Sequence, residues 1–508
     1  MSTSLRNITN QQIMEFLVIL GGCLFAAYAG NYIAEENYVP IAAVLGGLLI
    51  VSVVFGLGSS IYVLIPICWG LTGQISLLPL PFDVRQLTVI LTSIVFISGW
   101  IFKSHRGKVK IEVIDLWIWV NITYIFITFF RNPVGFASIG GGARVGGKPY
   151  VDVALGLMAY LMLSRFKISA KFIHLLPIIA LCVSLFNCIA GAVQLFLPNV
   201  SFVLGRFYSA FAIFGASGVE NIEVGETRLE FLQEFGVTLI LYIVSQISPI
   251  KLISANNIGK LVAYISAFLM IFLSGFRNAI IASMINSFVS VYTRERFSGL
   301  LKMGFVAFSI TVMGILISYT PFQIPLTFQR ALCFLPGNWN EVAVTDARNS
   351  TEWRQEMWQM ALTSNKYINS KIFGDGFGFR REDYDRAIDI SMGNSSLGPN
   401  EAQQEIFLLD GDYHSGPVGT IRFVGVVGLL LLLPLMGYMA FMAWRLIKET
   451  LGTQFELCTL FYCIPAVVMP FFFFVIIGDY RRDIVAILFN VGMIKMLRNS
   501  ITYNIANN

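Results

Sequence analysis

The sequence predicts an all-α, polytopic integral membrane protein with about 14 transmembrane helices, in a range of roughly 12–14. Of its 508 residues, 56% are hydrophobic and only 13% are charged, whereas soluble proteins have roughly 25% charged residues. Long apolar runs follow one another along most of the chain. One polar stretch, residues 322–422, interrupts them, and we expect it to lie in water on one face of the membrane.

The expected spans are apolar runs that approach the roughly 20 residues needed to cross a bilayer. They cover residues 13–33, 39–55, 61–77, 87–102, 113–129, 150–163, 172–197, 231–247, 261–276, 279–291, 300–319, 423–444, 455–477 and 484–497. No cleavage site follows the polar residues 1–12, so the first run is expected to stay as a span.

These runs divide the chain into four expected regions. They are N-terminal helices with outer loops (1–230), core helices (231–321), one large periplasmic loop containing short helices (322–422) and C-terminal helices (423–508).

The charges of the turns predict the orientation, because cytoplasmic turns of membrane proteins are enriched in lysine and arginine. If the N-terminus is cytoplasmic and the sides alternate, the basic turns at 103–110, 165–171, 251–260, 294–302 and 445–448 and the C-terminal tail all face the cytoplasm. Both termini are then cytoplasmic, and the polar stretch lies outside.

Several basic residues are expected on the outer face, where this rule does not favour them: Arg131, Arg144, Lys148, Arg206, Arg228, Arg277, Arg354, Arg422, Arg481 and Arg482. Arg277 stands between two apolar runs with almost no loop, so its guanidinium must lie at the membrane boundary. An ionisable group at that depth indicates a functional site. The alternative is that each arginine reaches the lipid headgroups or pairs with a loop carboxylate.

An arginine cluster at a membrane surface favours a phosphate-bearing ligand, because guanidinium presents a fixed fork of donors that fits phosphate oxygens. A substrate with a pyrophosphate at the surface and a hydrophobic tail in the bilayer fits this location. His414 is the only histidine outside an apolar run or a basic turn, and imidazole titrates near neutral pH. The seven cysteines form no C-x-x-C pair, so no metal site is expected.

Within the polar stretch, Ser350, Thr351 and Glu352 predict the start of a helix. Trp353, Met357, Met360 and Ala361 would form one apolar stripe on it, placed on the membrane surface or on the transmembrane body. Arg354 and Trp358 belong to the neighbouring stripe, so Arg354 can point toward a site while Trp358 anchors the helix or stacks on a sugar. The glycine-rich run 373–379 predicts tight turns.

Three pieces of the chain, in order, resemble the O-antigen ligase and O-antigen polymerase superfamily of bacterial membrane glycosyltransferases. They are the Ser274-Gly275-Phe276-Arg277 helix start, the Arg354…Trp358…Ala361 helix followed by 372–378, and His414 with Gly425-x-x-Gly428. Gly205-Arg206-Phe207 resembles the family's arginine-bearing outer loop. The family's asparagine after the histidine is Ser415 here, and Asp410 or Asp412 is expected to supply the carboxylate that the family carries before Gly-x-x-Gly.

The resemblance implies a GT-C-like fold in the bacterial inner membrane and an inverting glycan transfer that uses no metal and no cofactor. The donor would be a glycan on polyprenyl pyrophosphate, the acceptor a glycan or lipid, with membrane lipids around the protein and no nucleic acid. His414 is the expected base, and Arg277 is the second residue expected to be catalytic. The expected substrate-binding residues are Arg206, Arg354, Arg422, Arg228, Arg144, Lys148, Asp412 and Trp358.

The sequence leaves alternatives open. A ligase and a polymerase would share this chemistry and differ in the acceptor. A flippase or exporter of lipid-linked oligosaccharides would also have about fourteen helices, but transporters usually consist of two similar halves, and no internal repeat is visible here. A non-catalytic membrane scaffold is the third alternative.

Overall fold

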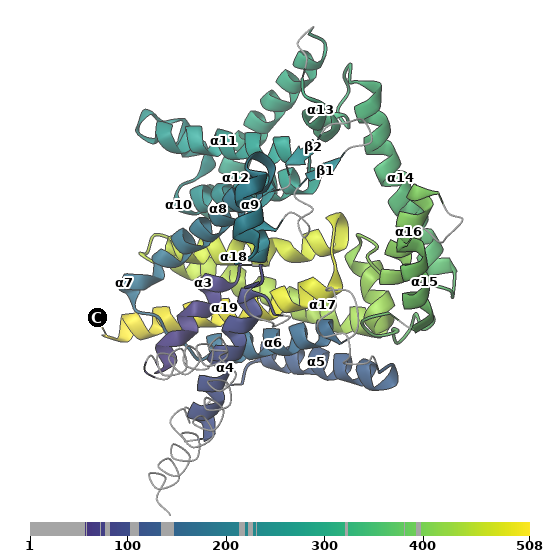
Figure 1. Cartoon of the computed structure of the whole chain (residues 1–508). Coiled ribbons are helices and arrows are strands. Elements are labelled where there is room, and N and C mark those ends of the chain that lie inside the picture. Colours follow the sequence, from purple (N-terminus) through teal and green to yellow (C-terminus); the bar gives the residue numbers. More distant parts are fainter. Residues whose placement is uncertain are drawn as a thin grey trace, which may run out of the picture. The chain divides into compact units, whose positions relative to one another are not determined.

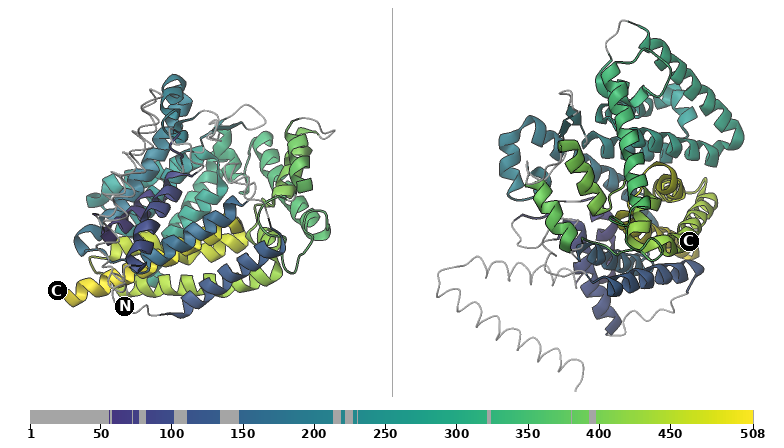
Figure 2. Two further views of the ribbon diagram at one scale, coloured as in Figure 1. Left: turned by 60° about the horizontal axis from the view of Figure 1, so that its bottom comes forward. Right: turned by 90° about the vertical axis from the view of Figure 1, so that its right-hand side faces the viewer.

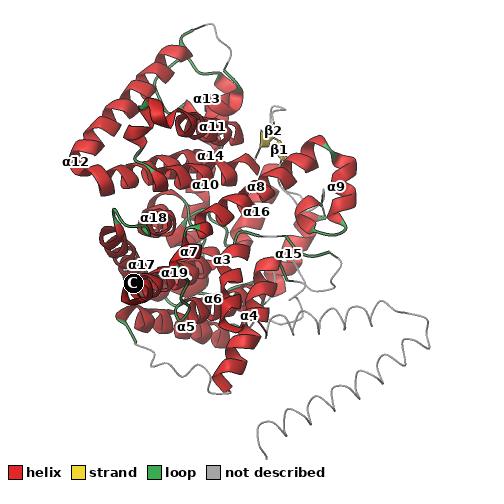
Figure 3. Cartoon of the chain, turned by 90° about the vertical axis from the view of Figure 1, so that its left-hand side faces the viewer, coloured by secondary structure: helices red, strands yellow, loops and turns green. Residues whose placement is uncertain are grey.

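Helices form nearly all the secondary structure of the described chain, as the sequence predicts (Figure 3). The computed structural model describes residues 56, 58–71, 73–76, 82–101, 111–133, 147–212, 219–221, 227–229, 231–320, 324–379, 381–392 and 398–507. The described residues from Tyr62 onward form one compact unit. The expected spans 13–33 and 39–55 lie outside the described residues.

The elements of the first part of the described chain are helical. They are the 3₁₀ helix η1 (Gly58–Val63), α3 (Leu64–Cys68), α4 (Val84–Ile101), α5 (Val113–Arg131) and α6 (Lys148–Leu163). The expected span 61–77 is therefore not one helix, and this prediction is wrong. After α3 the chain is extended and bonds to the segment after α9, with Ser76 N donating to Phe207 O and Ser209 N donating to Gln74 O. Gly73 allows this approach, because a Cβ atom there would stand 2.3 Å from the ring of Tyr208.

The middle of the chain adds one small sheet to the helices. Its elements are α7 (Ala170–Ile173), α8 (Leu175–Phe196), α9 (Pro198–Gly205), η3 (Ser209–Phe211), β1 (Val219–Asn221), β2 (Thr227–Leu229), α10 (Phe231–Gln246), η4 (Pro249–Ile253), η5 (Ala255–Asn257) and α11 (Ile258–Ser274). The two strands pair antiparallel. α10 packs between α8 and α11.

The element α12 (Arg277–Ser318) joins two of the expected spans, 279–291 and 300–319, across a kink. The kink is at Arg296, whose φ is 57°. Only Gly275 and Phe276 separate α12 from α11, as the sequence predicts, and Gly275 ends α11 in the left-handed conformation with φ of 72°.

Four shorter helices follow in the polar stretch: α13 (Leu326–Leu332), α14 (Glu341–Thr363), α15 (Arg381–Ser391) and α16 (Pro399–Asp410). α14, α15 and α16 are drawn in green at the right of Figure 1 and face the viewer in the right-hand view of Figure 2. The helix predicted to start at Ser350 begins earlier, at Glu341, because the side chain of Asn340 accepts a hydrogen bond from Val342 N (2.9 Å) and caps it.

The C-terminal helices form the centre of the packing. They are α17 (Gly416–Thr450), α18 (Glu456–Phe471), the π-helical turn η6 (Phe472–Ile476) and α19 (Tyr480–Asn507). α17 packs against α5, α18 and α19, and α19 also packs against α6 (Figure 1).

Seven helical segments of the described chain are long and apolar enough to cross a membrane. They are Val113–Arg131, Ala170–Phe196, Ala255–Ser274, Arg277–Ser318, Gly416–Thr450, Glu456–Ile476 and Tyr480–Asn504. Two shorter apolar helices, Val84–Gly99 and Phe231–Gln246, also coincide with expected spans. The described chain therefore has the composition and helix lengths of an all-α membrane protein.

One buried ionic cluster ties three of these helices together. Asp115 on α5 pairs with Lys495 on α19 and accepts a hydrogen bond from the hydroxyl of Tyr160 on α6. One turn away, Glu112 pairs with Arg498. A buried pair is costly unless its geometry is satisfied, so this cluster fixes α5, α6 and α19 in one arrangement.

Candidate functional site around His414

His414 lies in the short loop between α16 and α17. The loop begins with Gly411, which is left-handed with φ of 79°, and the N–H groups of Gly411 and Asp412 both donate to the carbonyl of Phe407. A Cβ atom at Gly411 would stand 2.9 Å from Cζ of Phe423. Glycine therefore satisfies both the backbone conformation and the available space, and the turn directs the next residues away from α16.

The imidazole of His414 is held by a carboxylate and two aromatic rings. Its Nδ1 lies 3.2 Å from Oδ1 of Asp412, and its ring centroid is 5.3 Å from that of Phe407 and 6.1 Å from that of Trp353. The side chain remains 27% exposed. The φ of His414 is 50°, a conformation that non-glycine residues rarely adopt and that concentrates at functional sites. Asp412 faces Nδ1, and Nε2 is the other ring nitrogen.

The apolar stripe expected on α14 is buried against other elements of the chain, among them α16. Met357 and Ala361 are fully buried in a cluster with α16 residues, and Trp353 packs against it. Trp358, expected to anchor or to stack on a sugar, donates its indole N–H to the carbonyl of Tyr413 (2.6 Å). α14 therefore supports the His414 loop directly. Burial raises the pKa of Tyr413, which keeps that residue neutral beside the loop.

Arg422 lies in a buried ion pair. Its Nη1 is 2.8 Å from Oδ2 of Asp375, and the two side chains are 2% and 6% exposed. Asp375 also accepts hydrogen bonds from the N–H groups of Asn369 and Ser370. The pair therefore fastens the glycine-rich turn to α17, and the expected contact of Arg422 with a substrate stays a prediction.

The glycine-rich turn and the Gly-x-x-Gly motif form one structural unit. α17 breaks at Gly425, where φ is 70° and ψ is −178°. Residues 371–376 lie along the break and exchange four hydrogen bonds with it: Asp375 N to Arg422 O, Gly376 N to Phe423 O, Val426 N to Lys371 O and Val427 N to Ile372 O. The predicted turns are confirmed, because Gly374, Gly376 and Gly378 all have positive φ.

A second buried pair, which the sequence did not place in the site, holds the end of α16. Arg481, at the start of α19, donates to both carboxylate oxygens of Asp410 (3.1 and 3.2 Å) and also contacts Asp479 (3.3 Å). Its guanidinium lies 4.8 Å from the ring centroid of Phe423. Its place among the basic residues expected on the outer face was a usable signal, but the sequence could not identify Asp410 as its partner.

Arg277, the first residue of α12, contacts α14, the helix that carries Arg354. Arg277 donates a long hydrogen bond to Ala347 O (3.5 Å). Ala347, Arg354 and Trp358 fall within about 40° of one another around the helix, with Arg354 about 10 Å along the axis from Ala347 and about 6 Å from Trp358. Along α14, Arg354 therefore lies between Ala347, which Arg277 contacts, and Trp358, which contacts the His414 loop.

The other expected residues lie on different elements. Arg206 follows α9, is exposed and stacks over Phe202 at 4.7 Å from the ring centroid. Lys148 is the first residue of α6, and Arg228 lies in β2 opposite Glu220. Arg144 lies outside the described residues. Their substrate contacts stay predictions.

The polar helices beside the site are joined by one carboxylate. Glu405 on α16 accepts from Lys366 (2.8 Å) and Tyr367 (2.7 Å) and pairs with Arg386 on α15 (2.8 Å). Burial opposes ionisation of Glu405, but the hydrogen bonds from Lys366 and Tyr367 outweigh it and lower its pKa. This ionised group therefore links α15 and α16 to the segment after α14.

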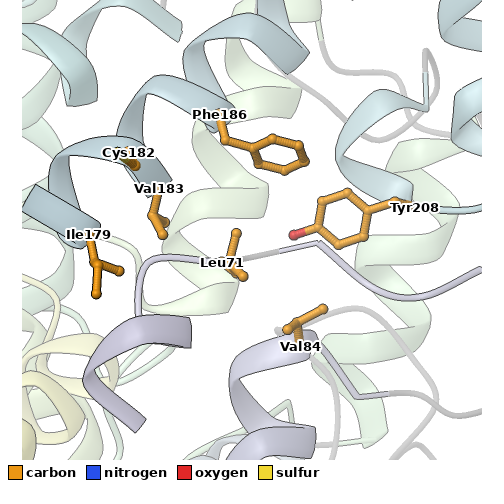
Figure 4. Close-up of a pocket in the computed structure, with 7 residues that line it drawn as sticks. All are labelled: Leu71, Val84, Ile179, Cys182, Val183, Phe186 and Tyr208. Carbon is orange, nitrogen blue, oxygen red and sulfur yellow. The ribbon is translucent and has the colours of Figure 1, made fainter. Parts of the chain in front are cut away.

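An apolar cavity of about 440 Å³ lies elsewhere in the described chain, beside α8 (Figure 4). It is lined by Leu71, Val84, Ile179, Cys182, Val183, Phe186 and Tyr208. This cavity was not expected from the sequence. It offers shape and apolar surface rather than groups that exchange protons.

Together, the described chain combines the helices of a membrane protein with a histidine–carboxylate pair in a polar segment. No group of three or more His, Cys, Asp or Glu side chains within the residues that the structure describes could hold a metal ion. No protein-family model matches the chain, and no curated protein matches it either. The resemblance to O-antigen ligases and polymerases therefore stays an expectation from the sequence.

Proposed function

We propose that this protein is a membrane glycosyltransferase that moves a glycan from polyprenyl pyrophosphate to a sugar hydroxyl of an acceptor. The observation that carries the proposal is the pair formed by His414 and Asp412. An accessible imidazole held by a carboxylate is the arrangement that general-base catalysis requires. Its position in the polar segment of a membrane protein suits a substrate that is half lipid and half sugar.

In the proposed reaction, Nε2 of His414 takes the proton of the acceptor hydroxyl. The hydroxyl oxygen then attacks the anomeric carbon from the side opposite the pyrophosphate. The bond from that carbon to the phosphate oxygen breaks, its electron pair stays on the leaving pyrophosphate, and the anomeric configuration inverts. The carboxylate of Asp412, whose Oδ1 lies 3.2 Å from Nδ1, stabilises the imidazolium that forms.

The proposed role of Arg277 and Arg354 is to neutralise the leaving pyrophosphate. α14 carries Arg354, accepts the hydrogen bond from Arg277 and contacts the His414 loop through Trp358, and these contacts support this role. Arg206, Arg228, Arg144 and Lys148 are proposed as outer contacts to phosphate or glycan. Arg422 would act through Asp375, by fixing the turn against α17.

The topology belongs to the same proposal. We place the protein in the bacterial inner membrane with roughly 12–14 spans in a GT-C-like arrangement, both termini in the cytoplasm and residues 322–422 outside. The seven long apolar helices of the described chain support the membrane location.

The experiment is complementation of a deletion strain with His414→Ala, with surface polysaccharide and lipid-linked intermediates as the readout. Loss of a general base lowers a rate by about 10²–10⁴-fold, so transfer should fall to near background while the amount of protein in the membrane is unchanged. His174→Ala is the matched control, because His174 is also exposed but lies after α7.

The intermediates that accumulate separate the alternatives. Long chains left on the carrier indicate a ligase, and single repeat units left on the carrier indicate a polymerase. Intermediates confined to the cytoplasmic leaflet would instead support the flippase or exporter. Full transfer by His414→Ala would contradict the proposed mechanism.

A further inference from the structure

The tip of the glycine-rich turn exposes apolar side chains although it belongs to the polar segment. Ile372 and Phe373 are 60% and 50% exposed. Their backbone is held firmly, because Ile372 O accepts from Val427 N (3.1 Å) and Phe373 O accepts from the Tyr124 hydroxyl (3.3 Å) and from Arg131 (3.2 Å). Two large apolar side chains are therefore presented outward on a fixed backbone.

The turn lies at one end of a pair of neighbouring apolar helices, α5 and α17. α5 and α17 run side by side in opposite directions, with Asn121 Nδ2 donating to Leu431 O (3.0 Å) (Figures 1 and 2). The C-terminal end of α5 and the break in α17 therefore lie at the same end of the pair, and the turn bonds to both.

The lengths of the two helices place this end at a membrane boundary. α5 rises by about 28 Å between Glu112 and Arg131, and α17 rises by about 28 Å between Val426 and Arg445. The hydrocarbon core of a bilayer is about 30 Å thick. When the opposite charged ends, Glu112 and Arg445, lie at one boundary, the turn lies at the other.

The surface around the turn has the composition of a lipid interface. Phe130 is exposed at the end of α5, and Val426, Leu430 and Leu433 continue an exposed apolar line down α17. Arg131 stacks over the ring of Phe373 at 5.2 Å. An arginine above an aromatic ring is well placed to reach lipid phosphates while the ring stays among acyl chains.

We propose that Ile372 and Phe373 insert into the phospholipid bilayer at its boundary and contact acyl chains. The partner is lipid, because the tip continues the apolar surface of α5 and α17 and the guanidinium of Arg131 lies beside it. Since the turn also fills the break in α17, its insertion fixes the height of that break, and of the loop that follows α16, relative to the membrane. This inference does not depend on glycan transfer.

The test is photo-crosslinking of the full-length protein in phosphatidylethanolamine and phosphatidylglycerol vesicles. Phe373→p-benzoylphenylalanine should yield lipid adducts by mass spectrometry at about the yield of Leu430→p-benzoylphenylalanine, an exposed position on α17. The matched control is Tyr384→p-benzoylphenylalanine on the charged helix α15, where the yield should be on the order of tenfold lower.

Every outcome of this test is decisive. If the variant at Phe373 elutes unlike the unmodified protein, the same label at Ile372 replaces it. Lipid adducts at the turn support the inference. Adducts with another protein, or a yield equal to that at Tyr384, would overturn it.

Discussion

Replacement of Gly425 by alanine tests whether the break in α17 holds the site together. The residue has φ of 70° and ψ of −178°, a region that is essentially restricted to glycine. An added Cβ atom would stand 2.2 Å from the carbonyl oxygen of Ile372 and 2.5 Å from Gly374 N. These neighbours are backbone atoms, so the clash cannot be relieved by a side-chain rotation.

The expected cost follows from these two effects. A non-glycine residue in this conformation costs about 1–3 kcal/mol. Moving the turn away weakens the four backbone hydrogen bonds between residues 371–376 and α17, which contribute about 1 kcal/mol each. Gly425→Ala should therefore reduce the free energy of unfolding by about 3–7 kcal/mol.

The assay is the thermal unfolding midpoint of the purified protein in one detergent. Unfolding of large proteins is often irreversible, so variants are compared at one scan rate. Gly437→Ala is the control in the same helix, because nothing lies within 4 Å of a Cβ atom there. Gly374→Ala should resemble Gly425→Ala, since its Cβ atom would stand 2.5 Å from backbone atoms of α17. Equal midpoints for Gly425→Ala and Gly437→Ala would refute the reasoning.

Two further predictions concern charged pairs. Arg422→Met should destabilise the protein by about 3–5 kcal/mol, because it leaves Asp375 buried without its cation. Arg445→Met, which removes an exposed pair, should leave the midpoint nearly unchanged, and similar losses in midpoint for the two variants would contradict the prediction. The lowered pKa of Glu405 stabilises the fold above its unfolded value of about 4.3, and this contribution is lost as the pH falls through the lower folded pKa. The difference in midpoint between the protein and Glu405→Gln should therefore shrink below about pH 4.3, and a difference that does not change with pH would argue against it.

The sequence predicted the class of fold well because lipid imposes a simple pattern on each span. The runs at 113–129, 172–197 and 455–477 needed only length and hydropathy, and each corresponds to a helix of the described chain. The span predicted at 61–77 failed because the glycines after α3 let the chain extend against Tyr208. There, backbone hydrogen bonds to the segment after α9 prevailed over the helix that the apolar run predicted.

Sequence reasoning named some residues that the structure brings together near His414, but not how they pair. His414 and Asp412 lie in one loop, and Trp358, on α14, contacts that loop. The partnership of Arg422 with Asp375 could not be read from the sequence, because it depends on two segments that meet only after folding. The start of α14 at Glu341, after its cap Asn340, was also missed. Several nearby residues could cap a helix, and the sequence does not choose among them.

Under the proposed function, the attachments at the two ends of α5 bear on where a lipid-linked substrate could enter. α5 is fastened near one end by its buried ionic cluster with α6 and α19 and at the other by the contacts of Arg131 and Tyr124 with Phe373. Because the turn that carries Phe373 is bonded to α17, separating α5 from α17 would require the contacts of Arg131 and Tyr124 with Phe373 to release. A passage for the long-tailed substrate of the proposed function is therefore expected on another side of α5.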